Sequence, residues 1–364
     1  MMIINLSTMR FNMAYYNKNK NEENKERKDH FQELTDKLIK RLEDDINYEK
    51  PWFVCNEAPF NPVTGTKYRG INFVSLLENG YDDPRFYTFN NIKSLAEETG
   101  QKLHVRKGEH GSPVFKAVQI EIKAKKDGEV EIGSDEGEGK EKAKIWVLAY
   151  SGTVFNGSQI EGLEPYQFRE RPAFQQQEEA EKVIEAMKAK GGVDLHFHSE
   201  GKAFYQPSAD RVVLPHRELF KNDALFYRTA LHEFGHSTGH PSRLNRDQTG
   251  EFGSAKYARE ELVAELSSYF MGAELGLPYD GRTHDNHAAY VKSWLQALKN
   301  DKSFIVKASQ AAAKSVDFQL TKRDEYVKDL EQQKATSKAY DDMMAKLGKT
   351  TREREQQKTV ALSR

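Results

Sequence analysis

Apolar residues recur at helical spacing in two parts of the chain, and short alternating runs lie between the helical stretches. In the first part, this pattern predicts a helix that starts near Asp29 and ends before Pro51. It also predicts three strands, at 85–89, 114–122 and 145–150. A helix capped by Asn90 or Asn91 should follow the first strand. Residues 123–144 are mostly Lys, Glu, Gly and Asp, which indicates a long mobile loop inside a hairpin.

The second part of the chain also combines stretches of helical spacing with short alternating runs. A helix is predicted over 177–190, where Gly191 and Gly192 follow it. Three short strands come next, at 193–198, 203–205 and 210–215. Further helices are predicted from Ala224, around 259–270, and over 283–299 and 301–319. Helices and strands mixed in both parts predict an α+β fold with two domains.

Local composition sets the limits of these domains. Residues 1–28 are rich in Asn, Lys and Glu towards their end, and we expect a disordered lead there. Residues 158–176 carry Gly, Pro, Gln and charged residues, which is typical of a linker. The two predicted domains are therefore 29–157 and 177–320. From 321 to 364 the chain is charged and poor in apolar residues, as in a solvated helix or a disordered tail.

Composition excludes several classes of protein. Hydrophobic residues make up 37% and charged residues 30%, and no apolar run approaches the roughly eighteen residues of a membrane span. The segment from Met1 to Met13 lacks the charged region and apolar core of a secretory signal. Cys55 is the single cysteine, so no internal disulfide can form, and we expect a cytoplasmic protein with no membrane partner. The formal net charge is −1, so any affinity for nucleic acid must come from a local basic patch.

The predicted helix from Ala224 carries the strongest chemical signal. Asn222 or Asp223 can cap it, and no proline interrupts it before Pro241. His232 and His236 are four residues apart, so both imidazoles lie on one face and can bind one zinc ion. Glu233 lies beside them and can accept a proton from a water that the metal has made more acidic. This is the H-E-x-x-H arrangement of zinc peptidases.

A third metal ligand needs a separate argument. Ser242 stands where the metzincin pattern requires a histidine, so that pattern does not fit. On the following helix, Glu261 can reach the metal, as in gluzincins, and Glu265 can hydrogen-bond the far nitrogen of a ligand histidine. Glu260, Glu265 and His240 remain alternative third ligands.

Two basic elements lie in the first domain. The first is a triplet in which an aromatic residue stands between two basic ones, Lys67, Tyr68 and Arg69, followed by Gly70. Such a triplet can stack a base and neutralise phosphates, although by itself it is better explained by a packed tyrosine with solvated charges. Residues 102–107 form a second basic element before a turn flanked by glycines.

Several blocks of sequence together resemble one family, the ArdC antirestriction proteins of plasmids and mobile elements. The blocks are PVTGTKYRGIN (62–72), VRKGEHG (105–111), AFY (203–205), ADRVVLP (209–215), HEFGHSTGHPSRLNR (232–246) and YAREELVAE (257–265). They occur in order within about residues 29–310. The insertion at 123–144 and the tail after 321 have no counterpart in this resemblance, which implies no role for them.

The resemblance implies a domain that binds single-stranded DNA, followed by a zincin-like metallopeptidase domain. It further implies that the protein protects transferred DNA in a bacterial host and is encoded on a plasmid or other mobile element. Seven residues then become candidates for DNA contact: Trp52, Lys67, Tyr68, Arg69, Asn72, Arg106 and Lys107. The main hypothesis is a DNA-binding antirestriction protein with a zinc peptidase that cleaves a peptide or protein substrate. Its rivals are a DNA-binding protein with a purely structural metal site and a metallopeptidase effector.

Overall fold

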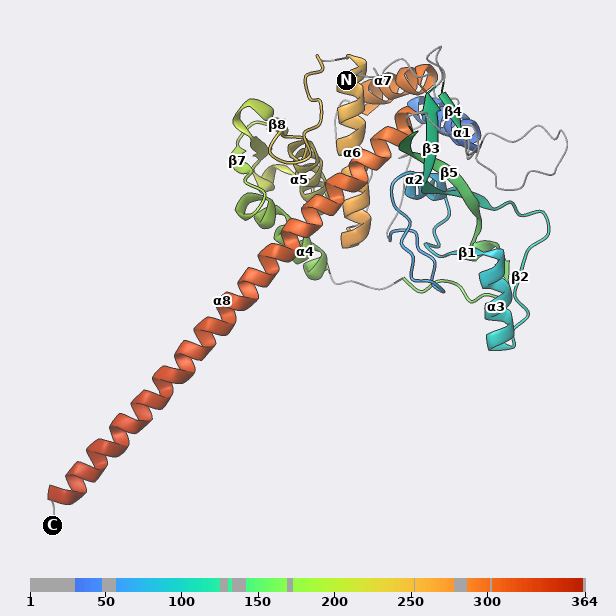
Figure 1. Cartoon of the computed structure of the whole chain (residues 1–364). Coiled ribbons are helices and arrows are strands. Elements are labelled where there is room, and N and C mark those ends of the chain that lie inside the picture. The colour runs from blue at the N-terminus through green and yellow to red at the C-terminus, as the bar shows by residue number, and fades with distance from the viewer. Residues whose placement is uncertain are drawn as a thin grey trace. The chain divides into compact units, whose positions relative to one another are not determined.

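The chain folds into two compact units (Figure 1). The computed structural model describes residues 30–47, 57–124, 130–132, 142–168, 173–251, 253–277, 287–301 and 303–362. The first unit is Met1–Arg169 with Ala288–Gln310, and the second is Glu170–His287 with Ala311–Arg364. Both contain helices and strands, which confirms the predicted two-domain α+β fold. The predicted disordered lead, together with Trp52 and Cys55, lies outside the described residues.

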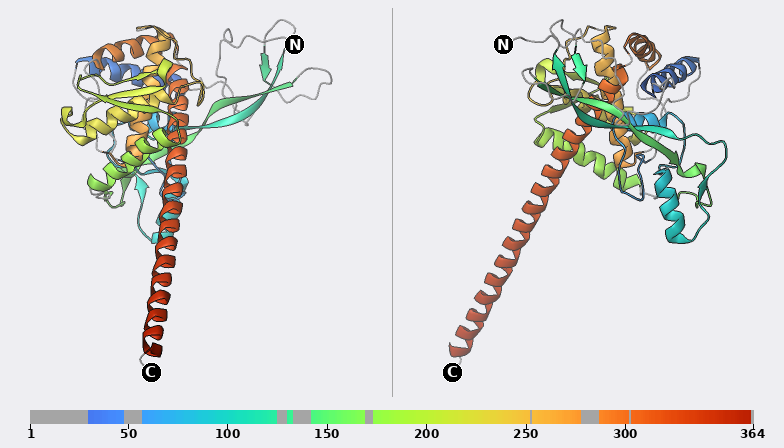
Figure 2. Two further views of the ribbon diagram at one scale, coloured as in Figure 1. Left: turned by 90° about the vertical axis from the view of Figure 1, so that its left-hand side faces the viewer. Right: turned by 45° about the vertical axis from the view of Figure 1, so that its right-hand side comes forward.

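The first unit is built on an antiparallel sheet of four strands in the order β1-β5-β3-β4. Its helices are α1 (His30–Asn47), α2 (Ile71–Leu77), α3 (Phe89–Thr99) and α7 (His287–Asn300), and its sheet strands are β1 (Phe86–Thr88), β3 (Ser112–Ala124), β4 (Val130–Ile132) and β5 (Lys142–Asn156). Figure 2 shows β3 and β5 as a long twisted pair, whose register runs from Ser112 opposite Val154 to Lys123 opposite Lys142. A smaller antiparallel pair joins β2 (His104–Val105) to β6 (Ile160–Glu161).

Three predictions for this unit need correction. The cap of α3 is Thr88, not Asn90 or Asn91, because the Thr88 side chain accepts the N–H of Asn91 and the Asn91 side chain accepts the N–H of Thr88. The loop predicted for 123–144 contains β4, which pairs with the end of β3. The hairpin itself is confirmed by the β3–β5 register.

The third correction concerns the linker predicted for 158–176. A 3-10 turn (Gly157–Gln159) leads into β6. Beyond β6, the backbone carbonyl of Glu164 accepts a hydrogen bond from Arg85 at 2.8 Å, and Tyr166 donates one to Glu57 at 2.7 Å. Residues up to 168 therefore pack with the first unit. The C-terminal limit predicted for the peptidase domain also differs from the structure. Residues 288–310 group with the first unit, where Nζ of Lys299 lies 2.6 Å from a carboxylate oxygen of Glu43 in α1.

The second unit places a small mixed sheet beside helices. The helices are α4 (Ala173–Ala189), α5 (Asp223–Ser237), α6 (Ala255–Leu275) and most of α8 (Phe304–Leu362), and the strands are β7 (Asp194–His198), β8 (Phe204–Gln206) and β9 (Arg211–Pro215). The strand order is β7-β9-β8, with β7 parallel and β8 antiparallel to β9, so β8 is an edge strand. Short 3-10 turns at Pro207–Ala209 and Arg217–Leu219 flank β9.

The core of this unit lies between α5 and α6. Leu231 and Phe234 of α5 and Leu262 and Leu266 of α6 have no exposed surface, and their burial fixes the two helices against each other. Beyond residue 321, α8 continues as a helix to Leu362, and most of its described side chains up to residue 346 are exposed, which fits the predicted solvated helix (Figure 1). Within the described part of the chain, no helix is both long and apolar enough to cross a bilayer.

Candidate functional site

His232 and His236 project from the second half of α5, as their spacing predicts. Asn222 caps this helix by accepting the N–H of Leu225 at 2.8 Å. The Nε2 atoms of the two imidazoles lie 3.2 Å apart. Both residues are largely buried, so the two nitrogens converge on a point inside the unit rather than in open solvent.

Glu261 of α6 faces the same point. Its carboxylate oxygens lie 3.6 Å from Nε2 of His232 and 3.7 Å from Nε2 of His236. The two helices can approach this closely because Gly235 has no side chain. A Cβ atom there would lie 3.3 Å from the Cα atom of Ala264, tighter than an ordinary van der Waals contact.

These three residues fit a divalent metal ion. Two ligand atoms held tetrahedrally at about 2.0–2.2 Å from zinc are about 3.3–3.6 Å apart, close to the separations between these three residues. His232, His236 and Glu261 are also the one group of three potential ligands that converges among the described residues. Two imidazoles and a carboxylate suit zinc and other borderline divalent ions.

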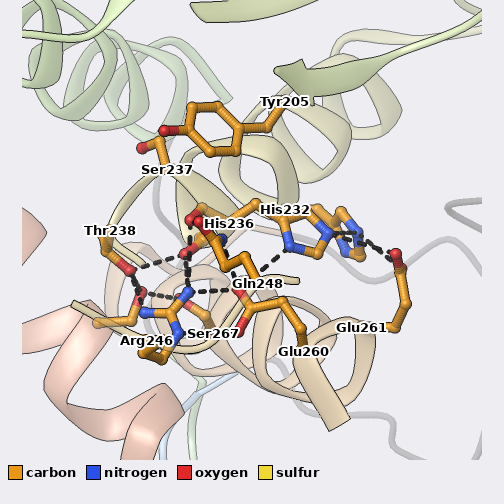
Figure 3. A network of polar contacts seen from close by, with 12 residues as sticks. Tyr205, His232, His236, Ser237, Thr238, Arg246, Gln248, Glu260, Glu261 and Ser267 are labelled. Atoms are coloured by element: carbon orange, nitrogen blue, oxygen red, sulfur yellow. Dashed lines mark hydrogen bonds and ion pairs between the residues drawn. The ribbon is translucent and has the colours of Figure 1, made fainter. Parts of the chain in front are cut away.

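The outer nitrogen of each histidine has its own carboxylate. Nδ1 of His232 lies 3.1 Å from Glu265. Nδ1 of His236 lies 3.3 Å from Glu260 (Figure 3). Glu260 and Glu265 therefore sit behind the imidazoles, which argues against either one as the third ligand. His240 is also turned to other partners, because its Nδ1 lies 2.8 Å from the hydroxyl of Ser242.

The carboxylates determine the protonation of the imidazoles. Burial lowers the pKa of His236, but the charge of Glu261 and the hydrogen bond to Glu260 outweigh burial and raise it to about 9. Burial also lowers the pKa of His232, but the hydrogen bonds to Glu261 and Glu265 outweigh burial and raise this pKa well above its usual range. Burial raises the pKa of Glu261, yet the charge of His236 and the hydrogen bonds to both imidazoles hold it far below normal. A metal cation would therefore replace protons on the imidazoles.

Glu233 occupies a different environment. Its side chain is buried, and it accepts a hydrogen bond from the backbone N–H of Tyr205 in the edge strand β8. Burial raises the pKa of Glu233, against the charges of His232 and His236, which lower it. A buried carboxylate with a raised pKa, next to a metal site, is suited to accept and return a proton.

In the first unit, a cavity of about 430 Å³ gathers several of the predicted DNA residues. Lys67, Tyr68, Arg69 and Asn72 line it, together with Asn61, Thr64, Thr66, Thr88, Asn91, Val114, Phe115 and residues 151–154. Lys67 and Arg69 are exposed and bring two cations to its edge. Arg106 and Lys107 do not line it; both are exposed, and Arg106 bonds the backbone carbonyl of Ser158.

Two of the candidate DNA residues are also committed to the fold. Only 8% of Tyr68 is exposed, and its ring packs with Leu76, Phe86 and Val154, as the triplet alone predicts for a packed tyrosine. The side chain of Asn72 bonds both the N–H and the carbonyl of Phe115, at 2.7 and 2.8 Å, where a register shift interrupts the β3–β5 pairing. Both residues therefore build the cavity wall, and their polar or aromatic groups are committed to the fold.

Sequence reasoning missed the groups that support the site. Arg246 and Gln248 bind Glu260, and Tyr205 supplies the N–H to Glu233. Arg246 and Tyr205 fall inside the blocks of sequence that carry the family resemblance. No local spacing rule joins either of them to the metal-binding helix, because their contacts are made only in the folded chain.

Comparisons with known proteins divide the chain in the same way. Residues 28–155 match a family model described as the N-terminal domain of anti-restriction factor ArdC. Residues 178–311 match a model described as a zincin-like metallopeptidase. Together these two matches include the cavity of the first unit and the histidine pair of the second.

Two curated relatives differ greatly in length. A protein named DNA primase TraC, from Escherichia coli, is 37% identical over 307 residues, which are 82% of this chain but 20% of that protein. The chain thus spans about a fifth of that relative. An uncharacterized protein of Sinorhizobium fredii is 31% identical over 300 residues, covering 80% of this chain and 91% of the relative.

Solved structures give a match over nearly their whole length. The metal-free crystal structure of the antirestriction ArdC protein from the R388 plasmid has a TM-score of 0.62 and 33% sequence identity, covering 82% of this chain and 99% of that one. The Mn(II)-bound structure of the same protein has a TM-score of 0.56 and 32% identity, with 80% and 97% coverage. This chain is therefore similar, across both of its units, to a protein that has been crystallised with a divalent metal.

Proposed function

Since this chain belongs to the ArdC family of antirestriction proteins, we propose that its second unit is a zinc-dependent peptidase and its first unit binds single-stranded DNA. The first unit is Met1–Arg169 with Ala288–Gln310, and the second is Glu170–His287 with Ala311–Arg364. We place the protein in the cytoplasm of a bacterial host, where a plasmid or other mobile element would encode it.

The peptidase proposal is carried by the convergence of His232, His236 and Glu261 beside the buried carboxylate of Glu233. The first three residues would hold one zinc ion. When bound, zinc supplies a Lewis acid that polarises a peptide carbonyl and makes a water more acidic. Glu233 would accept a proton from the attacking water and return it to the nitrogen of the leaving amine.

The edge strand β8 provides a place for a peptide backbone. Tyr205 in this strand donates its N–H to Glu233, so the strand lies directly beside the proposed base. An extended peptide can add to an exposed strand edge through backbone hydrogen bonds. The substrate we infer is therefore a peptide or protein segment in extended conformation.

A purely structural metal site is the main rival. Structural zinc sites are usually closed by four protein ligands, whereas catalytic sites keep a position open. Among the described residues, the converging group supplies three ligands. That count favours the catalytic alternative, and so does Glu233, which is buried beside the site without belonging to the ligand group.

The DNA proposal rests on the cavity of the first unit. Lys67 and Arg69 lie at its edge, and a flexible single strand can bring phosphates to them while an unpaired base enters the cavity. Duplex DNA keeps its bases stacked inside, so it can offer only its phosphates to the same residues. We therefore expect a preference for single strands and a binding affinity that falls with salt.

The test of the peptidase uses Glu233→Gln, with Glu218→Gln as a matched control because Glu218 is exposed. Each zinc-loaded protein is incubated with a library of unstructured peptides, and cleavage is followed by mass spectrometry. We expect cleavage by the wild type and the control but not by Glu233→Gln, with zinc content and DNA binding equal in all three. If Glu233→Gln cleaves as the wild type does, Glu233 is not the base.

A further inference from the structure

The carboxylate of Glu260 has a role that the sequence pattern does not suggest. It is adjacent to Glu261 on α6, but it points to the opposite side of His236, where its Oε1 lies 3.3 Å from Nδ1. When a metal is bound through Nε2, the ring keeps its remaining proton on Nδ1, where this carboxylate accepts it in a hydrogen bond. Nε2 of His236 is the atom that faces His232 and Glu261.

Glu260 is in turn held by a pair of residues from the loop that follows α5. Arg246 donates from Nε to Oε2 at 3.0 Å and from Nη2 to Oε1 at 2.6 Å, and Gln248 donates to Oε1 at 3.0 Å. The side chains of Glu260 and Arg246 are only 11% and 12% exposed. Such a forked pair fixes the orientation of the carboxylate as well as its charge.

The same two loop residues also grip the end of the metal-binding helix. Arg246 donates to the carbonyl of Gly235 at 2.8 Å, and Gln248 donates to the carbonyl of His236 at 2.7 Å (Figure 3). Gly239 makes this approach possible, because a Cβ atom there would lie 2.6 Å from Nε2 of Gln248 and 3.0 Å from Nη2 of Arg246. The loop therefore holds His236 from two directions, at its ring and at its backbone.

A buried chain of hydroxyl groups anchors this arrangement to α8. Nη1 of Arg246 lies 2.6 Å from the hydroxyl of Thr238, which lies 2.8 Å from the hydroxyl of Ser315 on α8. Ser315 in turn contacts Ser267 of α6 at 2.9 Å, and Gln319 donates to both serines. Polar groups buried in such a connected network have few alternative arrangements, so Arg246 is held in one orientation.

We propose that Glu260, Arg246 and Gln248 are positioning residues that hold His236 as a metal ligand. Arg246 and Gln248 orient Glu260, and Glu260 keeps the proton of His236 on Nδ1 and its lone pair directed at the metal. This inference rests on the proposed zinc site, and it concerns how tightly the ion is held. A lysine at position 246 would keep the charge but could not make the forked contact.

The test compares three variants with the wild type. Glu260→Gln removes the charge behind His236, and Gln248→Leu removes one donor to Glu260 without leaving a buried charge unpaired. Lys256→Gln is the matched control, because Lys256 joins the same loop to the same helix through Asp247 at 2.8 Å, with both side chains exposed. Zinc affinity is measured by competition with a chelator, and the visible spectrum of the Co²⁺-substituted protein reports ligand geometry.

We expect Glu260→Gln to bind zinc about 10- to 100-fold more weakly and to change the cobalt spectrum. Gln248→Leu should weaken zinc binding by about 2- to 10-fold, and Lys256→Gln should match the wild type. Circular dichroism of the metal-free proteins shows whether each variant is folded. If Glu260→Gln does not fold, the zinc affinity and cobalt spectrum of Gln248→Leu test the inference. If a folded Gln248→Leu or Glu260→Gln has the zinc affinity and cobalt spectrum of the wild type, the positioning role is wrong but the zinc site stands. If the wild-type protein takes up neither zinc nor cobalt, both the positioning role and the zinc site are wrong.

Discussion

Nδ1 of His232 lies 3.1 Å from a carboxylate oxygen of Glu265, one helical turn after Glu261 on α6. The opposite nitrogen of the same ring, Nε2, faces Glu261 and His236. One helix thus supplies both a proposed metal ligand and the carboxylate that orients another ligand. The pair defines the tautomer in which His232 can donate a lone pair to a metal.

Replacing Glu265 by glutamine should weaken zinc binding by about 10- to 100-fold, because a neutral amide lowers the basicity of the imidazole that it contacts. Chelator competition at neutral pH measures the affinity, with the exposed Glu218→Gln as control. A folded Glu265→Gln with wild-type affinity would remove this residue from the site.

Zinc affinity should rise with pH up to about 9, where His236 loses its proton in the metal-free protein. The sign follows from the raised pKa of the imidazole: below that pH the ring is protonated, and the metal must displace a proton to bind. Each proton displaced contributes a factor of about 10 in apparent affinity per pH unit. Isothermal titration of zinc between neutral pH and pH 9, in buffers of different ionisation enthalpy, counts the protons released. A titration with no proton release contradicts this account.

The same raised pKa has a consequence for the metal-free protein. Because the folded state binds the proton of His236 more tightly than the unfolded chain does, the stability from this group is fully present below the usual histidine pKa and is lost as pH rises through about 9. The melting temperature of the metal-free wild type should therefore fall over that range more than that of His236→Gln. If the melting temperatures of the two proteins change with pH in the same way, the proton on His236 contributes nothing to stability.

Changing Lys67 and Arg69 together to alanine should weaken single-stranded DNA binding and flatten its dependence on salt. If each residue neutralises one phosphate, the slope of log affinity against log salt should decrease by about 1.4. Fluorescence anisotropy with a labelled oligothymidine, at several salt concentrations, measures both quantities. Lys93→Ala with Lys116→Ala is the matched control, since both lysines are exposed on the same unit and neither lines the cavity. An unchanged slope in the Lys67–Arg69 variant would place the DNA elsewhere.

Tyr68→Ala should act on stability instead of on DNA directly. Its ring packs edge-on against Phe86 at 6.4 Å between centroids, and removal of a buried aromatic ring costs about 3–5 kcal/mol. Tyr68→Phe keeps the ring and should retain DNA affinity within about twofold. Urea denaturation and anisotropy on the same samples separate the two effects. A stable Tyr68→Ala with lost DNA binding would instead make this tyrosine a direct DNA contact, as the family resemblance implies.

Local spacing was enough to predict the histidine pair and the acidic helix after it. His232 and His236 share a helix face because they are four residues apart, and Glu261 and Glu265 share another for the same reason. Which acid would face the metal could not be read from that spacing. The choice depends on how closely α5 approaches α6, and this is set by Gly235 against Ala264, far apart in sequence.

The first unit shows the limit of local patterns more clearly. The triplet Lys67, Tyr68 and Arg69 by itself predicts a packed tyrosine between solvated charges, and the structure agrees. It does not show what buries the tyrosine, because Val154, which packs against it, lies 86 residues further along the chain. Asn72 finds its partner 43 residues away at Phe115. Such pairings follow from the sheet register, which neither composition nor hydrophobic period specifies.

The central claim is that one divalent ion is held by His232, His236 and Glu261. The most direct measurement is the zinc content of protein dialysed against excess zinc and then against metal-free buffer, for the wild type, Glu261→Ala and the double variant His232→Ala–His236→Ala. We predict about one zinc ion per chain in the wild type, and strongly reduced retention in both variants, lowest in the double variant. Equal zinc content in all three proteins, or none in the wild type, would contradict the claim.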